Sequence, residues 1–352
     1  MSGSGSQIVL LQRNEMTSEF PQELHEEVIS HLWDDLTSLA ACSLTSKSLT
    51  VPSQRRLFAF INLTEPRRDI NVGSSASFYE LLTRSPHIAR YVESLQISSM
   101  NLNDRSRLRT PVTLGHDAQD LVRLPFEDYK LKNGRKIRDL DAIAVTSNRD
   151  PFDTWLTRDG FLAACATLLP NLKSLDIIYN GSWGSLSFRN LIALLYLMRL
   201  PSLRYLRLEC NKTCPISTVN AAMGSNIKYL VISASGGNEE LPIQHLRPFT
   251  APIYLEHFAA DNFGLQMANL QQYRVQACRL RRLVIKANHG HFNTWTLLQS
   301  CWETLEDFQF TPCKDGKSVD PKVIQEVFCA ITMPSQLLGC LARLVAMKSA
   351  LI

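Results

Sequence analysis

Few residues in this chain combine the types and the spacing that chemistry requires. The segment His289-Gly-His291 is a lone His-x-His pair, whereas a zinc site needs further ligands at fitting spacing. Gly236-Gly237 lacks the Lys and the Ser or Thr of a phosphate-binding loop. The adjacent carboxylates Asp34-Asp35 and Glu239-Glu240 need not converge on one point, and a solvated turn accounts for them. The sequence therefore predicts no catalytic residues, no metal site, no cofactor and no enzymatic activity.

The nine cysteines are an odd number and include no Cys-x-x-Cys pair. Cys210 and Cys214 form a close pair, but no second pair exists to complete a zinc site. This usage predicts reduced thiols in an intracellular protein. The N-terminal apolar run at 8–11 is too short for a secretion signal, and the apolar stretch at 336–352 is shorter than a membrane span. We expect a cytoplasmic or nuclear protein with no membrane partner.

The formal net charge of +4 is small for 352 residues, so it predicts no nucleic-acid partner. A basic run at 130–138 has the composition of a nuclear address or a phosphate-binding patch. Acidic residues flank this run on both sides: Glu127, Asp128, Asp139 and Asp141. A solvated loop is therefore the favoured interpretation of the run.

The dominant pattern is an apolar triplet, Leu-x-x-Leu-x-Leu, that occurs seven times. The triplets are Val92/Leu95/Ile97, Leu172/Leu175/Ile177, Leu203/Leu206/Leu208, Ile227/Leu230/Ile232, Leu255/Phe258/Ala260, Leu280/Leu283/Ile285 and Leu305/Phe308/Phe310. The middle residue of the last six recurs every 24 to 31 positions, which is close to the period of a leucine-rich repeat. Four triplets lead to an Asn or Cys that suits the turn out of a strand: Asn180, Asn211, Asn288 and Cys313. We expect a solenoid of helix–strand units with a parallel sheet on its concave face; the alternative is a set of unrelated α/β strands.

Residues that alternate with the buried positions of each strand point to the opposite face of the sheet. The candidates for holding a substrate on that face are Tyr205, Arg207, Tyr229, His257, Arg282 and Lys286. The competing interpretation is that opposite charges on adjacent strands neutralise one another. The pairs would be Asp176 with Arg207, Asp261 with Lys286, and Arg282 with Asp307. The aromatic members are the stronger binding candidates, because exposed aromatic side chains often anchor interfaces.

Three short helical patterns precede the triplets. The first begins near Pro21, the second follows a capping Asp34 or Asp35, and the third begins around Pro52 and runs through Ile61. This region carries more large apolar residues than three short helices can bury. We therefore expect it to dock onto the downstream domain or onto another protein.

Three blocks of this region occur in a recognisable order and spacing. They read Phe20-Pro21-x-Glu23-Leu24-x-x-x-Val28-Ile29-x-x-Leu32, then Leu39-x-x-Cys42-Ser43-Leu44, then Arg55-Arg56-Leu57-Phe58. The region resembles an F-box of the type common in fungi. The resemblance implies binding to the Skp adaptor and, through it, to a cullin–RING ubiquitin ligase. The adaptor-binding residues that it implies are Phe20, Pro21, Leu24, Val28, Ile29, Leu32, Leu36, Leu39 and Leu44.

The predicted fold is α/β, with an N-terminal three-helix F-box followed by a leucine-rich-repeat solenoid. The expected organisation is a disordered tail at 1–16, an F-box-like helical domain at 17–63, a linker at 64–77, a solenoid at 78–330 with an insertion at about 100–153, and a tail helix at 331–352. F-box proteins frequently carry leucine-rich repeats, so the two parts of the interpretation agree.

The leading functional hypothesis is a substrate-recognition subunit of an SCF-type ubiquitin ligase. Such a chain binds the adaptor and an unknown protein substrate, and it accelerates ubiquitin transfer by proximity alone. The alternative is a non-catalytic leucine-rich-repeat scaffold that acts outside a ligase, with the helices serving as an end cap. A third hypothesis, a hydrolase or transferase on an α/β scaffold, requires a nucleophile, a His and an acid from different repeats to meet in one pocket.

Overall fold

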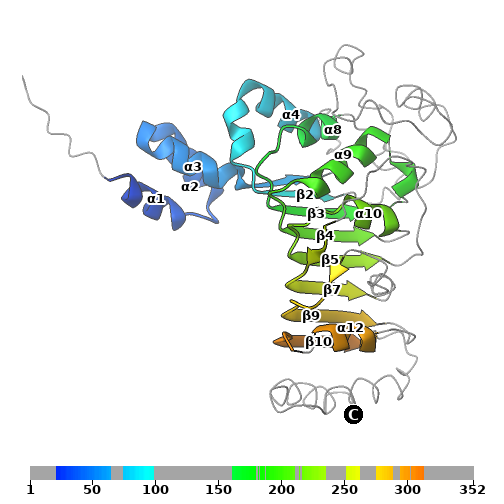
Figure 1. Ribbon diagram of the computed structural model, residues 1–352. Coiled ribbons are helices and arrows are strands. Elements are labelled where there is room, and N and C mark those ends of the chain that lie inside the picture. The colour runs from blue at the N-terminus through cyan, green and yellow to red at the C-terminus, as the bar shows by residue number, and fades with distance from the viewer. Residues whose placement is uncertain are drawn as a thin grey trace, which may run out of the picture. The chain divides into compact units, whose positions relative to one another are not determined.

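The computed structural model of the chain (Figure 1) describes residues 21–64, 74–98, 161–179, 181, 183–186, 188–210, 214, 216–234, 251–261, 275–287, 294–301 and 303–312. The chain divides into two compact units, residues 1–57 and 58–352. Several expectations lie outside the described residues: the tail at 1–16, Phe20, the insertion at 100–153 with its basic run, the turn residues Asn180, Asn211, Asn288 and Cys313, the segment 289–291, and the tail at 331–352.

The first unit contains helices α1 (Gln22–Ser30), α2 (Leu36–Thr45) and most of α3 (Lys47–Ala59). Of the two predicted caps, Asp34 and Asp35, it is Asp35 that caps α2: its carboxylate accepts hydrogen bonds from the hydroxyl and the amide of Ser38, at 2.5 and 3.0 Å. These bonds hold the pKa of Asp35 below its ordinary value. The expected start of the third helix near Pro52 is wrong, because the hydroxyl of Ser46 accepts the Ser48 amide and starts the helix at residue 47.

In the described part of the first unit, two large apolar side chains, Ile29 and Leu39, are fully buried, and Pro52 and Ser53 of α3 are buried as well. Neither Ile29 nor Leu39 belongs to the contiguous apolar core of the second unit. The Thr50 hydroxyl donates to the Ser43 carbonyl at 3.0 Å and so ties α3 to α2. Several large apolar side chains of these helices remain exposed, among them Leu24, Leu36 and Leu44.

The second unit is built on an eight-stranded, all-parallel sheet in the order β1-β2-β3-β4-β5-β7-β9-β10. The strands are β1 (Phe60–Leu63), β2 (Ser94–Ser98), β3 (Ser174–Tyr179), β4 (Tyr205–Cys210), β5 (Tyr229–Ala234), β7 (His257–Asp261), β9 (Arg282–Ala287) and β10 (Asp307–Pro312). A separate parallel pair joins β6 (Ile253–Tyr254) to β8 (Val275–Gln276). The predicted α/β class is confirmed, and helices followed by a long parallel sheet are consistent with a leucine-rich-repeat-like structure.

Helices gather on one side of this sheet (Figure 1). They are α4 (Ser74–Arg84), α8 (Phe161–Ala166), α9 (Phe188–Arg199), α10 (Ile216–Ala222) and α12 (Thr294–Cys301), with short 3-10 turns η1 (Pro86–Arg90) and η2 (Trp183–Ser185). In sequence order, α4, α8, α9 and α10 pack each against the next. Helix α4 begins at Ser74, inside the stretch expected to be a linker. The run expected to be helical through Ile61 turns into strand β1 at Phe60, where Ile61 and Leu63 pair with β2.

The apolar triplets form the core between the sheet and the helices. Every described triplet side chain is buried except Leu305, which is half-buried. The residues between them along each strand are half-buried or exposed. This alternation is the period-two pattern of a sheet with one covered face, and it confirms the burial expected from the triplets.

The backbone repeats one contact at the start of six strands, from β3 to β10 in the large sheet. The Lys173 carbonyl accepts the amides of Arg204 and Tyr205, at 2.8 and 3.0 Å, and the Arg204 carbonyl accepts those of Lys228 and Tyr229 at the same distances. Six carbonyls accept two successive amides in this way: those of Glu93, Lys173, Arg204, Lys228, Glu256 and Arg281. The repeated contact fixes where each strand begins relative to the previous one.

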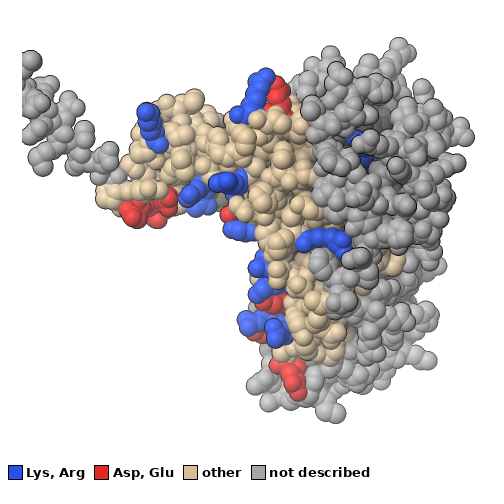
Figure 2. Space-filling view, turned by 45° about the horizontal axis from the view of Figure 1, so that its top comes forward, with Lys and Arg blue, Asp and Glu red and all other residues tan. Residues whose placement is uncertain are grey.

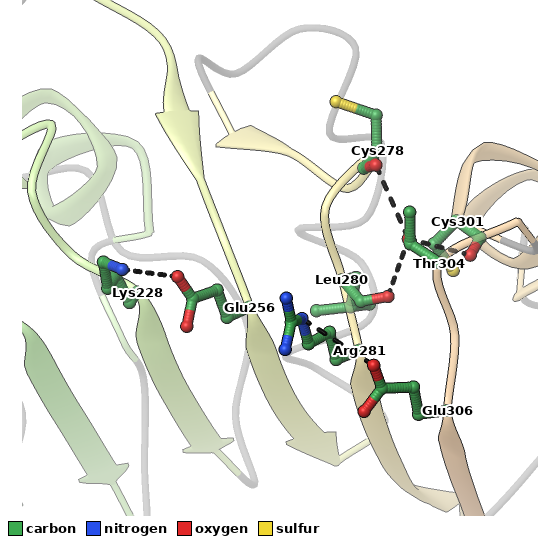
Figure 3. A network of polar contacts seen from close by, with 8 residues as sticks. All are labelled: Lys228, Glu256, Cys278, Leu280, Arg281, Cys301, Thr304 and Glu306. Atoms are coloured by element: carbon green, nitrogen blue, oxygen red, sulfur yellow. Dashed lines mark hydrogen bonds and ion pairs between the residues drawn. The ribbon is translucent and has the colours of Figure 1, made fainter.

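A second repeated contact joins the corners through side chains. The donors and the acceptor carbonyls are Asn171 to Arg90 (3.0 Å), Ser202 to Pro170 (3.0 Å), Asn226 to Pro201 (2.8 Å) and Thr304 to Cys278 (3.5 Å). Each donor directly precedes the first residue of a triplet, and each acceptor lies two residues before the preceding triplet. Thr304 also donates to the Leu280 carbonyl at 2.9 Å (Figure 3). Tyr254 and Arg279 directly precede the triplets that begin at Leu255 and Leu280. There the Arg279 guanidinium lies 4.5 Å from the centre of the Tyr254 ring.

Truncation of a triplet residue should destabilise the second unit. Leu206 and Leu283 are fully buried at equivalent positions of β4 and β9. We expect Leu206→Ala and Leu283→Ala each to lower the free energy of unfolding by about 2–5 kcal/mol, because each leaves a cavity. Denaturant titration followed by circular dichroism measures this loss. Val231→Ala, at a half-buried position of β5, is the matched control and should cost much less; equal costs would contradict the assignment of faces.

Candidate protein-binding surfaces

The open face of the sheet, opposite the triplet side chains, aligns equivalent residues of successive strands. Its first row follows from the strand register and contains Phe60, Ser94, Ser174, Tyr205, Tyr229, His257, Arg282 and Asp307. All of these side chains are half-buried or exposed. Four of the predicted substrate-face residues therefore fall in one row, and Arg207 lies in the next row, two residues along β4. Lys286 pairs with Asp261 in the register, but its side chain lies outside the described residues.

Three aromatic rings of the first row form a stack. The ring centres of Tyr205 and Tyr229 are 6.4 Å apart with a 36° interplanar angle, and those of Tyr229 and His257 are 4.5 Å apart at 31°. These distances lie in the range of attractive aromatic pairs. The neighbour of Tyr205 on the other side is Ser174, which has no ring to continue the stack. The stack therefore ends at Tyr205.

Two ion pairs form on this face. The Arg282 Nε lies 3.2 Å from an Asp307 carboxylate oxygen, as expected from the sequence. The Arg207 Nη2 lies 2.7 Å from a Glu209 carboxylate oxygen, two residues along its own strand. Asp176 and Arg207 lie opposite each other in the strand register, as expected. The short ion pair of the Arg207 guanidinium, however, is with Glu209.

Asp176 is the carboxylate left over by this arrangement. Its Oδ1 is buried and has no hydrogen-bond partner. Burial raises the pKa of Asp176, with Arg207 acting in the opposite direction and Glu209 in the same direction. Burial and the charge of Asp176 also raise the pKa of the Tyr205 phenol, against the effect of Arg207. These four side chains therefore lie within electrostatic reach of one another.

A row of charged residues lies directly before the N-terminal ends of the strands, and we call this end of the strands the sheet edge. It pairs Lys173 with Glu93 at 2.7 Å, Lys228 with Glu256 at 2.5 Å, and Arg281 with Glu306 at 3.8 Å. Figure 3 shows the last two pairs on adjacent strands, and Figure 2 shows basic and acidic side chains close together along this part of the surface. The hydrogen bond from Lys228 lowers the pKa of Glu256. These exposed pairs neutralise each other, so the edge offers little net charge to a ligand.

The first unit presents a different surface, rich in exposed apolar side chains. They are Leu24, Val28, Trp33, Leu36, Leu44 and Val51, which make up six of the nine exposed large hydrophobic residues in the described part of the chain. Leu44 is 87% exposed and Trp33 71%. Leu24 and Val28 lie four residues apart in α1, on one face of the helix.

The predicted adaptor-binding residues divide into two groups. Pro21, Leu24, Val28, Leu36 and Leu44 are exposed and Leu32 is half-buried. Ile29 and Leu39 are buried, so they hold the helices together and are not available for a direct contact. Trp33 and Val51 were not predicted. Trp33 lies in the turn between α1 and α2, where no helical periodicity marks it.

No protein-family model matches the sequence, and no curated protein is similar to it at a significant level. Among the described residues, no group of three or more His, Cys, Asp and Glu side chains is placed to hold a metal ion. No helix in the described part of the chain has the length and apolarity to cross a membrane. The thiols of Cys210, Cys214 and Cys301 are buried, and burial raises the pKa of Cys301 to about 12.

Replacing the unpaired carboxylate should stabilise the protein. Because the pKa of Asp176 is raised in the folded state, its ionised form is less favourable there than in the unfolded chain. At neutral pH we expect Asp176→Asn to raise the melting temperature by at most about 2–4 °C, since solvent limits the gain to below about 1 kcal/mol. The gain should vanish as the pH falls below the ordinary Asp pKa, where both states are protonated.

Thermal melts of the two proteins across this pH range measure the effect. Asp307→Asn is the matched control, because it removes a carboxylate that pairs with Arg282, and it should give no gain. A lower melting temperature for Asp176→Asn at neutral pH would show that the carboxylate has a stabilising partner.

Proposed function

We propose that this chain is the substrate-recognition subunit of an SCF-type cullin–RING ubiquitin ligase, acting in the cytoplasm or the nucleus. In this proposal the first unit is an F-box that binds a Skp-type adaptor. The second unit is a leucine-rich-repeat solenoid, and its open sheet face binds a protein substrate. The chain carries out no bond chemistry itself. It holds the substrate near the ubiquitin-loaded enzyme, so that transfer becomes nearly intramolecular.

The observation that carries the proposal is the surplus of exposed apolar side chains on the helices of the first unit. Six large apolar residues are exposed there, whereas Ile29 and Leu39 alone are its fully buried large apolar side chains. Contiguous apolar surface on a soluble protein is a mark of an interaction site, because association removes that surface from water. Five of the exposed residues, counting Pro21, fall on positions that the F-box resemblance implies for adaptor contact: Pro21, Leu24, Val28, Leu36 and Leu44.

The second unit supports the other half of the proposal. Its strands follow one another with the same corner contacts from Glu93 to Arg281, as repeats of one unit would. The open face is preformed by backbone hydrogen bonds, so a partner that binds there meets a small ordering cost. The half-buried aromatic stack is the kind of feature that anchors protein interfaces.

The adaptor interaction can be tested with purified full-length chain and a purified Skp-type adaptor. We expect Leu24→Asp and Val28→Asp to weaken adaptor binding by about tenfold or more, since each places a charge in a desolvated apolar interface. Isothermal titration calorimetry measures the affinity. Leu168→Asp is the matched control, because Leu168 is an exposed apolar residue of the second unit, and it should bind as the wild type does.

A third variant separates direct contact from loss of structure. Ile29→Ala removes a buried side chain, so it should weaken binding only together with the helical circular dichroism of the first unit. Wild-type affinity in Leu24→Asp and Val28→Asp, or no adaptor binding by the wild type, would contradict the ligase role. The scaffold acting outside a ligase would then be the better account of the same two surfaces.

A further inference from the structure

We propose that the open face recognises its protein substrate through a basic side chain, a Lys or Arg that packs against Tyr205 over Ser174 and places its cation beside Asp176. This inference rests on the function proposed above and names the chemistry of the substrate. It commits to a positively charged segment of a protein, and it locates the contact on strands β3 and β4.

The strand register brings the required groups together. Ser174 lies opposite Tyr205, and Asp176 lies opposite Arg207, so Asp176 and Tyr205 are diagonal neighbours on one face. Diagonal neighbours of this kind are within reach of aromatic and long side chains. The carboxylate and the phenol also influence each other electrostatically. A side chain that crosses Ser174 therefore meets a ring on one side and a carboxylate at its tip.

The charges around Asp176 favour a cation. The cluster contains two carboxylates, Asp176 and Glu209, and one guanidinium, that of Arg207. The guanidinium is 2.7 Å from Glu209, and Asp176 Oδ1 has no hydrogen-bond partner. Asp176 as a whole is half-buried, so an ammonium or guanidinium group placed beside it on the open face would be attracted by this net negative charge. A phosphate or an acidic side chain would meet a net negative charge at the same point.

The aromatic stack explains why the contact is placed at Tyr205. Tyr229 has a ring on each side, from Tyr205 and His257. The other side of Tyr205 faces Ser174, which is too small to cover the ring. The aliphatic stem of Lys or Arg can pack on that free side, and its charge is attracted by the ring. The described basic side chain of this row, Arg282, forms an ion pair with Asp307.

The test uses the full-length chain and a fluorescein-labelled peptide of Gly and Ser residues that contains two Arg residues. Fluorescence anisotropy at low salt measures binding, with a peptide in which both Arg residues are replaced by Glu as the negative probe. We expect the Arg peptide alone to bind. Asp176→Asn and Tyr205→Ala should each weaken binding by about three- to tenfold, the range expected for a partly exposed ionic or cation–π contact.

The matched control is Glu306→Gln. It changes the net charge of the chain by the same amount as Asp176→Asn, but at a paired carboxylate on the sheet edge, so it should leave the affinity within about twofold of the wild type. Failure of the Arg peptide to bind, unchanged affinity in Asp176→Asn, or equal losses in Asp176→Asn and Glu306→Gln would each overturn the inference.

Adaptor binding by the same variants separates this inference from the proposed function. Asp176→Asn and Tyr205→Ala should bind the Skp-type adaptor as the wild type does, because neither residue belongs to the first unit. Loss of the peptide contact with adaptor binding intact would overturn the basic-substrate inference alone. Absence of adaptor binding by the wild type, with the peptide contact present, would overturn the ligase role alone.

Discussion

The backbone contact that starts each strand is the constraint on which the second unit depends. One carbonyl accepts two successive amides of the following repeat, and this happens at six consecutive corners. The contact fixes which residue begins the next strand. The register between the two strands is therefore set by the backbone, without any contribution from side chains. A shift by one residue would exchange the two faces of every strand, exposing the triplets and burying Asp176 and Arg207. Core and surface are thus fixed together.

The same register makes equivalent residues of successive strands into neighbours, which gives the open face its chemistry. Tyr205, Tyr229 and His257 stack because they occupy one position in three adjacent strands. Arg282 and Asp307 pair for the same reason. On a face built in this way, equivalent side chains of adjacent strands contact one another. A ligand can bind where one strand lacks a side chain that continues the row of contacts. Ser174 beside Tyr205 is one such interruption, and the unpartnered oxygen of Asp176 lies next to it.

The strands of the second unit could be predicted from the triplets, because burial at period two leaves a strong apolar signal. Strand β1 could not, since its four residues continue a helix and carry no triplet. The Asn, Ser or Thr before four of the seven triplets was a readable signal for the corner contacts, in Asn171, Ser202, Asn226 and Thr304. Which carboxylate Arg207 contacts was not readable, because Asp176 across the strand and Glu209 along it are both within reach. The F-box resemblance likewise implied that Ile29 contacts the adaptor, although that side chain is buried.

The two surfaces differ in the kind of selectivity that they can give. Apolar burial is non-directional, so the surface that includes Leu24 and Val28 suits a partner of complementary apolar shape. Charges and aromatic edges give register and discrimination, because a wrong partner leaves them unpaired. Asp176 and Glu209 outnumber the single guanidinium of Arg207 in their cluster, so a basic partner is attracted there, whereas an acidic partner is repelled. A surplus of one carboxylate can therefore bias the open face towards basic segments without any change in the fold.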